Sequence, residues 1–289
     1  MRPLSGVLLG PVVCLALIAS AGLADAADRA GKANPWAAYF PAKGVTCTEQ
    51  VAKDGVVKGI MRTTVKKKSA REVVTYTPGA GRSTYQLLSG GRLHKAKSAT
   101  DTDGGYRTHI SAAMTLPSPG ALAHHKAGRQ SITMTMTVPR RSAHLLLQHG
   151  RTFRMVALYR AGGLGAQRMQ LADADQTQVP AVGYRVALRS LTISNFKPAY
   201  RNRFKRQIRP VFTELQYTSW MAERLGEVLF FHRNSRGTRW TATSTGCVRR
   251  THDARTTSAP AAGLPAGLLP AQHIDASRAA RVFATAVRR

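Results

Sequence analysis

Two residues with catalytic potential, His232 and Cys247, stand in the stretch FFHRNSRGTRWTATSTGCVRR, which runs from Phe230 to Arg250. A histidine can act as a general base, and the thiolate that it generates from a cysteine is a strong nucleophile. The same two residues also fit a simpler arrangement, in which His232 precedes a hairpin turn and Cys247 forms a disulfide. The elements that carry the two side chains decide between these interpretations.

The N-terminus has the pattern of a secretory signal peptide. One basic residue, Arg2, precedes an apolar run from Val7 to Ile18, and small residues follow at Ala24 and Ala26. This pattern predicts cleavage after Ala26 and export to the periplasm, the cell wall or the medium. The apolar run is too short to span a bilayer, and no later stretch is long enough to do so.

The cysteines favour the disulfide interpretation. Cys14 lies within the signal peptide, so the mature chain keeps only Cys47 and Cys247. Disulfides persist in exported proteins, and these two cysteines stand near the two ends of the β-rich region. We therefore predict a Cys47–Cys247 disulfide.

The chain is strongly basic, with 43 Lys and Arg against 14 Asp and Glu and a net charge of +29. Such a chain attracts anions, which for an exported protein are anionic polysaccharide, lipid headgroups or nucleic acid. One segment combines cations with Tyr200 and Phe204, and aromatic side chains can stack on sugars or bases. The predicted anion-binding residues are Lys197, Arg201, Arg203, Lys205, Arg206 and Arg209. A solvated charged face is the alternative.

Alternation of apolar and polar residues dominates the pattern. In SITMTMTVP, Ile132, Met134, Met136 and Val138 fall on one face and Ser or Thr on the other, as in a half-buried strand. Turn clusters PGAGR, TDGG, RAGGLG and NSRG separate such runs. The fold class predicted is all-β or strongly β-rich, an antiparallel meander, sandwich or barrel-like body. Helix is expected only in ALAHHKAG and in the C-terminal DASRAARVFATAVRR.

An internal repeat is a further expectation. The segment GYRTHISAAMTLPSP from Gly105 resembles GYRVALRSLTISNFKP from Gly183, and chance similarity between β-rich segments is the alternative.

The predicted domain organisation has five parts. These are a signal peptide at 1–26, an N-terminal extension at 27–44, a β-rich body at 45–250 with a subdivision near 140, an Ala- and Pro-rich linker at 251–274, and a short basic helix or disordered tail at 275–289.

The segment Ser244-Thr245-Gly246-Cys247-Val248-Arg249, preceded by a histidine, resembles the active-site motif of the L,D-transpeptidases, which cross-link peptidoglycan. The resemblance covers about Leu145 to Arg250. It implies that Cys247 is the nucleophile, His232 the base and Arg249 a contact of the substrate carboxylate. The family usually has Gly where Arg233 stands and commonly His where Thr245 stands.

The function that we predict is non-catalytic binding of an anionic polymer or lipid headgroup by an exported protein of the cell envelope or the extracellular space. No catalytic residue, metal site or cofactor is assigned. A divergent L,D-transpeptidase-like cysteine enzyme acting on peptidoglycan is the first alternative, and a structural or assembly component is the second. The sequence leaves the oligomeric state open.

Overall fold

A computed structural model describes residues 33–103, 105–234 and 237–249 of the chain. The predicted signal peptide at 1–26, the linker at 251–274 and the tail at 275–289 lie outside the described residues. No helix in the described ranges is long and apolar enough to cross a membrane.

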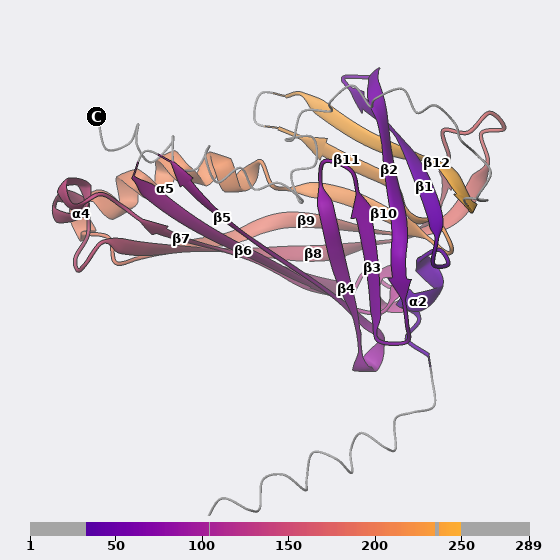
Figure 1. The fold of residues 1–289 in the computed structure, drawn as a ribbon, viewed down its shortest axis with the longest axis horizontal. Helices are drawn as coiled ribbons and strands as arrows, with labels where there is room; N and C mark the ends of the chain where they lie inside the picture. Colours follow the sequence, from indigo (N-terminus) through magenta and orange to yellow (C-terminus); the bar gives the residue numbers. More distant parts are fainter. Residues whose placement is uncertain (1–32, 104, 235–236, 250–289) are drawn as a thin grey trace, which may run out of the picture. The chain divides into compact units, whose positions relative to one another are not determined.

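The described residues form twelve antiparallel strands in one closed barrel (Figure 1). Each strand pairs with the next along the chain, and the last pairs with the first. This architecture confirms the predicted β-rich, barrel-like body. The strands are β1 (Val45–Lys53), β2 (Val56–Lys68), β3 (Glu72–Thr77), β4 (Gly81–Leu88), β5 (Arg92–Asp103), β6 (Tyr106–Leu116), β7 (Ala127–Thr137), β8 (Thr152–Gln170), β9 (Gln178–Ser194), β10 (Tyr217–Ala222), β11 (Gly226–Arg233) and β12 (Arg239–Arg249).

Alternation along the strands places apolar side chains in the interior. In β7, Ile132, Met134 and Met136 are buried, and the Ser and Thr residues between them are half-buried, as the sequence predicts. The similar segments that start at Gly105 and Gly183 both form strands, β6 and β9. Strands before and after residue 140 share the one closed sheet.

The turn expected at RAGGLG is wrong, because β8 runs through this segment without interruption. The glycines serve a close approach of the chain instead. A Cβ atom on Gly163 would lie 2.5 Å from the carbonyl oxygen of Leu122 and 2.7 Å from that of Lys126. Gly165 has a φ of +90° at a register shift between β8 and β9. The glycines thus let the segment around α3 (Pro119–Ala123) pack against β8.

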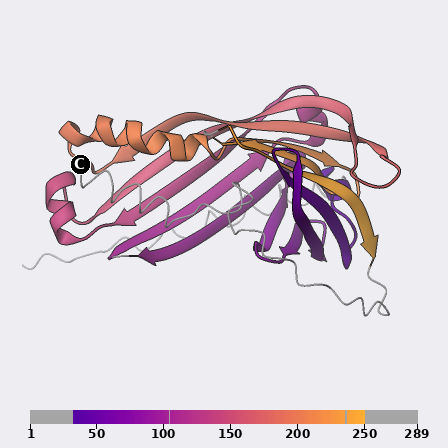
Figure 2. The same ribbon diagram turned by 90° about the horizontal axis from the view of Figure 1, so that it is seen from above.

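The sequence analysis missed the longest helix, α5 (Pro198–Thr213), because it interpreted this segment only as a run of charge. Its buried residues, Phe204, Ile208 and Phe212, are four residues apart and therefore line one face of the helix. Pro198 occupies the first turn, where a missing N–H group has no cost. Figure 2 shows α5, in orange, along the long strands of the barrel, and the ring of Phe204 stacks on that of Phe196 with the centroids 4.7 Å apart.

The other helices are short. The helix expected in ALAHHKAG is only the five-residue α3, since Ala127 already begins β7. Two further helices, α2 (Trp36–Tyr39) and α4 (Arg140–Leu146), were not expected, and the 3-10 turn η1 spans Ser89–Gly91. Trp36 of α2 is completely buried and donates a hydrogen bond from Nε1 to the carbonyl oxygen of Pro117 over 2.8 Å.

The predicted disulfide is confirmed and lies at the seam of the barrel. Cys47 on β1 and Cys247 on β12 are paired across the two strands, and their sulfur atoms are bonded at 1.98 Å. The first and last strands are therefore joined by a covalent bond as well as by backbone hydrogen bonds.

Replacing both cysteines, Cys47→Ser with Cys247→Ser, should lower the free energy of unfolding by roughly 3–5 kcal/mol, since the bond closes a long loop and so reduces the entropy of the unfolded chain. Urea unfolding monitored by tryptophan fluorescence measures this difference. A reductant should destabilise the native protein by a similar amount and leave the double variant unchanged. Equal stability of the oxidised protein and the double variant would contradict the prediction.

Candidate functional site

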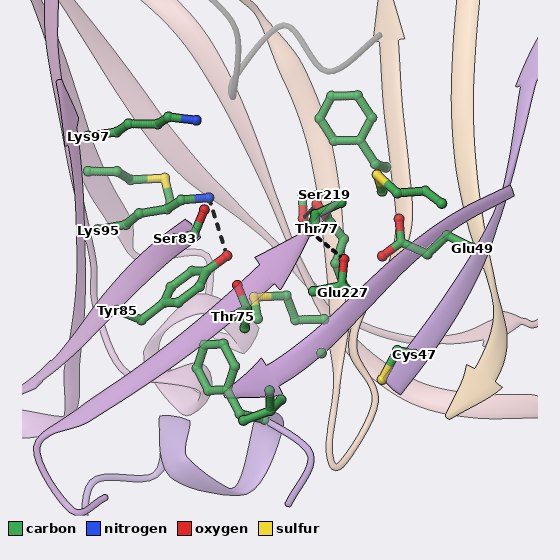
Figure 3. Close-up of a pocket in the computed structure, with 18 of the residues that line it drawn as sticks. Cys47, Glu49, Thr75, Thr77, Ser83, Tyr85, Lys95, Lys97, Ser219 and Glu227 are labelled. Atoms are coloured by element: carbon green, nitrogen blue, oxygen red, sulfur yellow. Dashed lines mark hydrogen bonds between the residues drawn. The ribbon is translucent and has the colours of Figure 1, made fainter. Parts of the chain in front are cut away.

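A partly open cavity of about 120 Å³ lies in the barrel and is lined by inward-facing side chains (Figure 3). Apolar walls come from residues such as Met61, Val65, Met114 and Phe230. Four charged side chains also line the cavity, and they come from three strands: Glu49, Lys95, Lys97 and Glu227. An apolar cavity with a few convergent polar groups is the usual form of a small-molecule site.

Lys95 and Lys97 enter the cavity from β5, where the alternation places them on the same face as the buried Leu93. Lys95 Nζ donates a hydrogen bond to Tyr85 Oη over 3.2 Å and lies 4.9 Å from the centre of the Tyr85 ring. Lys97 Nζ donates to the carbonyl oxygen of Ala80 over 3.1 Å. Burial, and then the charge of Lys95, lowers the pKa of Lys97. Two ammonium groups that line the same cavity favour an anion.

Glu49 and Glu227 form the acidic side of the cavity. Glu49 on β1 is only 6% exposed, and its Oε2 is buried without a hydrogen-bond partner among the described residues. Glu227 on β11 accepts a hydrogen bond from Ser219 Oγ. Burial, and then the charge of Glu227, raises the pKa of Glu49 well above its usual range. Burial also raises the pKa of Glu227, against the opposing effects of the Ser219 hydrogen bond and the charge of Lys95.

The two carboxyl groups therefore hold a proton more readily than free glutamates do, and ionisation of one opposes ionisation of the other. Among the described residues, no group of three or more His, Cys, Asp and Glu side chains is placed to hold a metal ion.

Two buried tyrosines stand beside the acidic pair. Tyr217 Oη donates a hydrogen bond to Gln130 Oε1 over 3.2 Å, and the rings of Tyr184 and Tyr217 meet edge to face at 6.1 Å. The ring of Phe230 lies 5.3 Å from that of Tyr217. Burial raises the pKa of both tyrosines, so their hydroxyl groups stay neutral. The charge of Glu227 contributes to both pKa shifts, so the two tyrosines lie on the acidic side of the cavity.

The sequence analysis missed all four charged residues of the cavity, although the strand pattern carried a signal. Glu49 stands between Cys47 and Val51 at alternate positions, and Lys95 follows Leu93 in the same way. A charged residue in register with the apolar positions of a strand faces the interior, where it requires a specific partner.

The structure does not bring together His232 and Cys247, the base and nucleophile that the resemblance to L,D-transpeptidases implies. His232 is paired with Trp240 across the β11–β12 hairpin, and Cys247 lies seven residues further along β12, or roughly 23 Å at the rise of a strand. The Nδ1–H group of His232 donates to the carbonyl oxygen of Gln216 over 2.9 Å, and burial lowers the pKa of this histidine. Cys247 is bonded to Cys47 in the disulfide and therefore has no free thiol.

Arg249, the third residue of the resemblance, is exposed at the end of β12 and paired with Val45. The expected turn at NSRG connects β11 to β12, with Arg233 opposite Arg239, although Ser235 and Arg236 lie outside the described residues. The resemblance to L,D-transpeptidases stays a prediction.

The predicted anion-binding residues divide into two groups. Arg203, Arg206 and Arg209 are exposed on α5 at intervals of three residues, while Arg201 and Lys205 are half-buried. Arg201 Nη2 donates to the carbonyl oxygen of Phe196 over 2.9 Å, and Lys197 Nζ donates to that of His144 over 2.7 Å. The exposed arginines can contact a ligand in solution, whereas Arg201 and Lys197 hold the start of the helix through these hydrogen bonds.

Comparison with known proteins gives only distant likenesses. No family model matches this chain, and no curated protein matches it. A solved structure of a "putative exported protein with YmcC-like fold" from Bacteroides fragilis NCTC 9343 is similar with a TM-score of 0.36 and 10% identity, over 72% of this chain and 98% of that chain. A "putative lipoprotein" from Parabacteroides distasonis ATCC 8503 is similar with a TM-score of 0.36 and 9% identity, over 73% and 98%. Both values are too low to place this chain in a family.

The variant Glu49→Gln should be more stable than the native protein at neutral pH, because the amide has no charge to bury and can donate a hydrogen bond to Glu227. A carboxyl whose pKa is raised by folding stabilises the protein fully below its ordinary value of 4.5 and loses that contribution as the pH rises through the folded value. The gain should therefore be small at pH 4 and reach roughly 1–3 kcal/mol above the folded pKa. Urea unfolding from pH 4 to 8 measures it.

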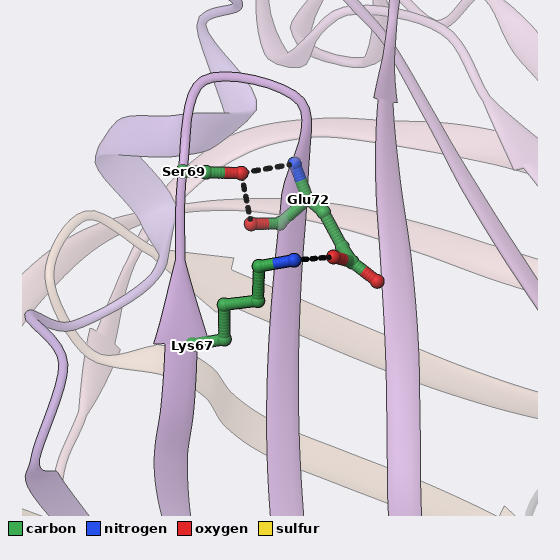
Figure 4. A network of polar contacts seen from close by, with 3 residues as sticks. All are labelled: Lys67, Ser69 and Glu72. Atoms are coloured by element: carbon green, nitrogen blue, oxygen red, sulfur yellow. Dashed lines mark hydrogen bonds and ion pairs between the residues drawn. The ribbon is translucent and has the colours of Figure 1, made fainter.

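The matched control is Glu72→Gln on the surface. Glu72 binds Lys67 Nζ at 2.6 Å and exchanges hydrogen bonds with Ser69 through its backbone (Figure 4). Losing this exposed ion pair should cost less than about 1 kcal/mol. A destabilising effect of Glu49→Gln at neutral pH would show that the Glu49 charge is satisfied in the folded protein.

Proposed function

We propose that this chain is an exported, non-catalytic binding protein that holds a small ligand in its barrel, with an anionic group of the ligand at Lys95 and Lys97. The observation that carries the proposal is the position of these two lysines, side by side on β5 and facing an apolar cavity. Charge-assisted hydrogen bonds from two ammonium groups suit a phosphate or carboxylate.

The balance of charge in the cavity supports an anionic ligand. The raised pKa values of Glu49 and Glu227 favour their neutral forms, which leaves less negative charge to oppose the two ammonium groups. Its apolar walls, which include Met61, Met114 and Phe230, suit the hydrocarbon part of a ligand. The cavity volume of about 120 Å³ suits a headgroup or a small molecule and is too small for a polysaccharide or nucleic acid.

Export and the absence of catalysis rest on separate observations. The N-terminal pattern predicts a signal peptide, and a disulfide at the barrel seam is typical of extracytoplasmic proteins. With Cys247 held in that disulfide and His232 bonded to Gln216, the alternative cysteine enzyme has less support than a binding function.

The outer face of α5 supports a second candidate function, binding of an anionic polymer. Arg203, Arg206 and Arg209 form an exposed stripe about one helical turn apart. A stripe of cations can contact successive negative groups of a polymer, which a small cavity cannot.

Calorimetry with butyl phosphate and 1-butanol tests the cavity. Butyl phosphate should bind, and the substitutions Lys95→Met and Lys97→Met should each weaken binding about ten-fold or more, because each removes a charge-assisted hydrogen bond. 1-Butanol should bind weakly and equally to all variants. The control is Lys66→Met, since Lys66 is exposed on β2. Equal affinity of the native protein for the alcohol and the phosphate would refute the proposal.

Heparin serves as an anionic polysaccharide probe for α5. The double variant Arg206→Gln with Arg209→Gln should weaken binding and reduce the slope of log K against log salt by about 1 for each contact removed. Lys58→Gln with Arg62→Gln on β2 removes the same charge from other exposed positions and should have a smaller effect. The same slope in both double variants would remove α5 from the polymer-binding surface.

A further inference from the structure

We propose that the barrel cavity has a second subsite, formed by Glu49 and Glu227, that binds the primary ammonium group of the ligand. The inference rests on the proposed anion site at Lys95 and Lys97 and narrows the ligand to a small zwitterion. Its ammonium group would lie on the acidic side of the cavity and its anionic group at the two lysines.

The unpartnered oxygen of Glu49 is the first observation. Its Oε2 is buried and has no hydrogen-bond partner among the described residues, and the Glu49 side chain is part of the cavity lining. Buried polar atoms in proteins are nearly always hydrogen-bonded, and a buried carboxylate requires a donor that also carries positive charge. A primary ammonium group has three N–H donors and can bond Glu49 and Glu227 at once.

The side chains that face the acidic pair leave this role to a ligand. Ser219 Oγ donates to Glu227, which satisfies one of several acceptor positions on that carboxylate. Tyr217 Oη donates to Gln130 instead. Lys95 Nζ donates to Tyr85 Oη, and Figure 3 shows both lysines on the opposite side of the cavity from Glu49.

The aromatic rings beside the acidic pair are the second observation. Tyr184, Tyr217 and Phe230 all line the cavity, and the ring of Tyr217 contacts both of the others. The charge of Glu227 acts on both tyrosines, and the faces of aromatic rings attract ammonium groups. A cation seated between carboxylates and aromatic rings is stabilised by both, whereas a neutral alkyl group would leave the carboxylates unpaired.

Size and charge together define the ligand class. A cavity of about 120 Å³ is somewhat smaller than the roughly 150 Å³ that admits benzene in another protein, so the part of the ligand inside it has about five or six non-hydrogen atoms. A zwitterion pairs each of its charges with protein charges of the opposite sign, and no unpaired charge is buried. Short amino acids with separated amino and acid groups meet these conditions.

Calorimetric titration with ω-amino acids of two to five methylene groups tests the inference, with butyrate and butylamine as probes that carry one charge each. The zwitterion of best length should bind at least ten-fold more tightly than butyrate. Glu49→Gln and Glu227→Gln should each remove that advantage, so that the zwitterion binds no better than butyrate. Glu72→Gln, on the surface, should leave every affinity unchanged.

Folding does not confound the test, since Glu49→Gln is expected to be at least as stable as the native protein, and near-ultraviolet circular dichroism checks each variant. If butyl phosphate binds through Lys95 and Lys97 but the ammonium group adds nothing, the inference is wrong and the proposed function stands. A second outcome is that ω-amino acids and butylamine bind through Glu49, and that the double variant Lys95→Met with Lys97→Met binds both compounds with unchanged affinity. In that case the ammonium subsite stands and the proposed anion site is wrong. Binding of no ω-amino acid at all overturns the inference.

Discussion

Pairing of the first strand with the last is the interaction on which the rest of the structure depends. Backbone hydrogen bonds between β1 and β12 close the sheet, and the Cys47–Cys247 disulfide holds the same seam. Closure removes the free edges of the sheet and separates an interior face from an exterior face along every strand. The two cysteines are 200 residues apart in the chain, and closure of the barrel makes them adjacent in space.

Closure also sets the energetic conditions of the cavity. Inward-facing positions of the strands are removed from water, so a charged side chain there must be matched by a partner. Lys95 donates a hydrogen bond to Tyr85 and Lys97 to the Ala80 carbonyl group, while Oε2 of Glu49 has no partner in the part of the chain that the structure describes. An interior built only for stability would carry apolar residues at these positions. The four charged side chains therefore lower the stability of the interior, which is consistent with the binding function proposed above.

The helix α5 shows how one segment can serve both folding and surface chemistry. Its apolar face carries Phe204, Ile208 and Phe212 into the core, and Tyr159 Oη donates to the carbonyl oxygen of Phe212 over 2.9 Å. Its outer face carries the arginine stripe. In a helix, residues three or four positions apart lie on the same side. The apolar residues four apart are therefore buried together, and the arginines three apart are exposed together.

The sequence by itself determined the class of fold and the chemistry of the seam. Period-two alternation in segments such as SITMTMTVP predicts strands, because side-chain direction in a strand depends only on local geometry. Two cysteines after a predicted signal peptide predict one disulfide. It did not reveal α5, where charge concealed the apolar residues, or the continuity of β8 through RAGGLG. The tertiary structure alone decided which charged residues share the cavity. Glu49 and Glu227 meet only because β1 and β11 both flank β12 in the closed barrel, and strand pairing between distant segments is not encoded in local pattern.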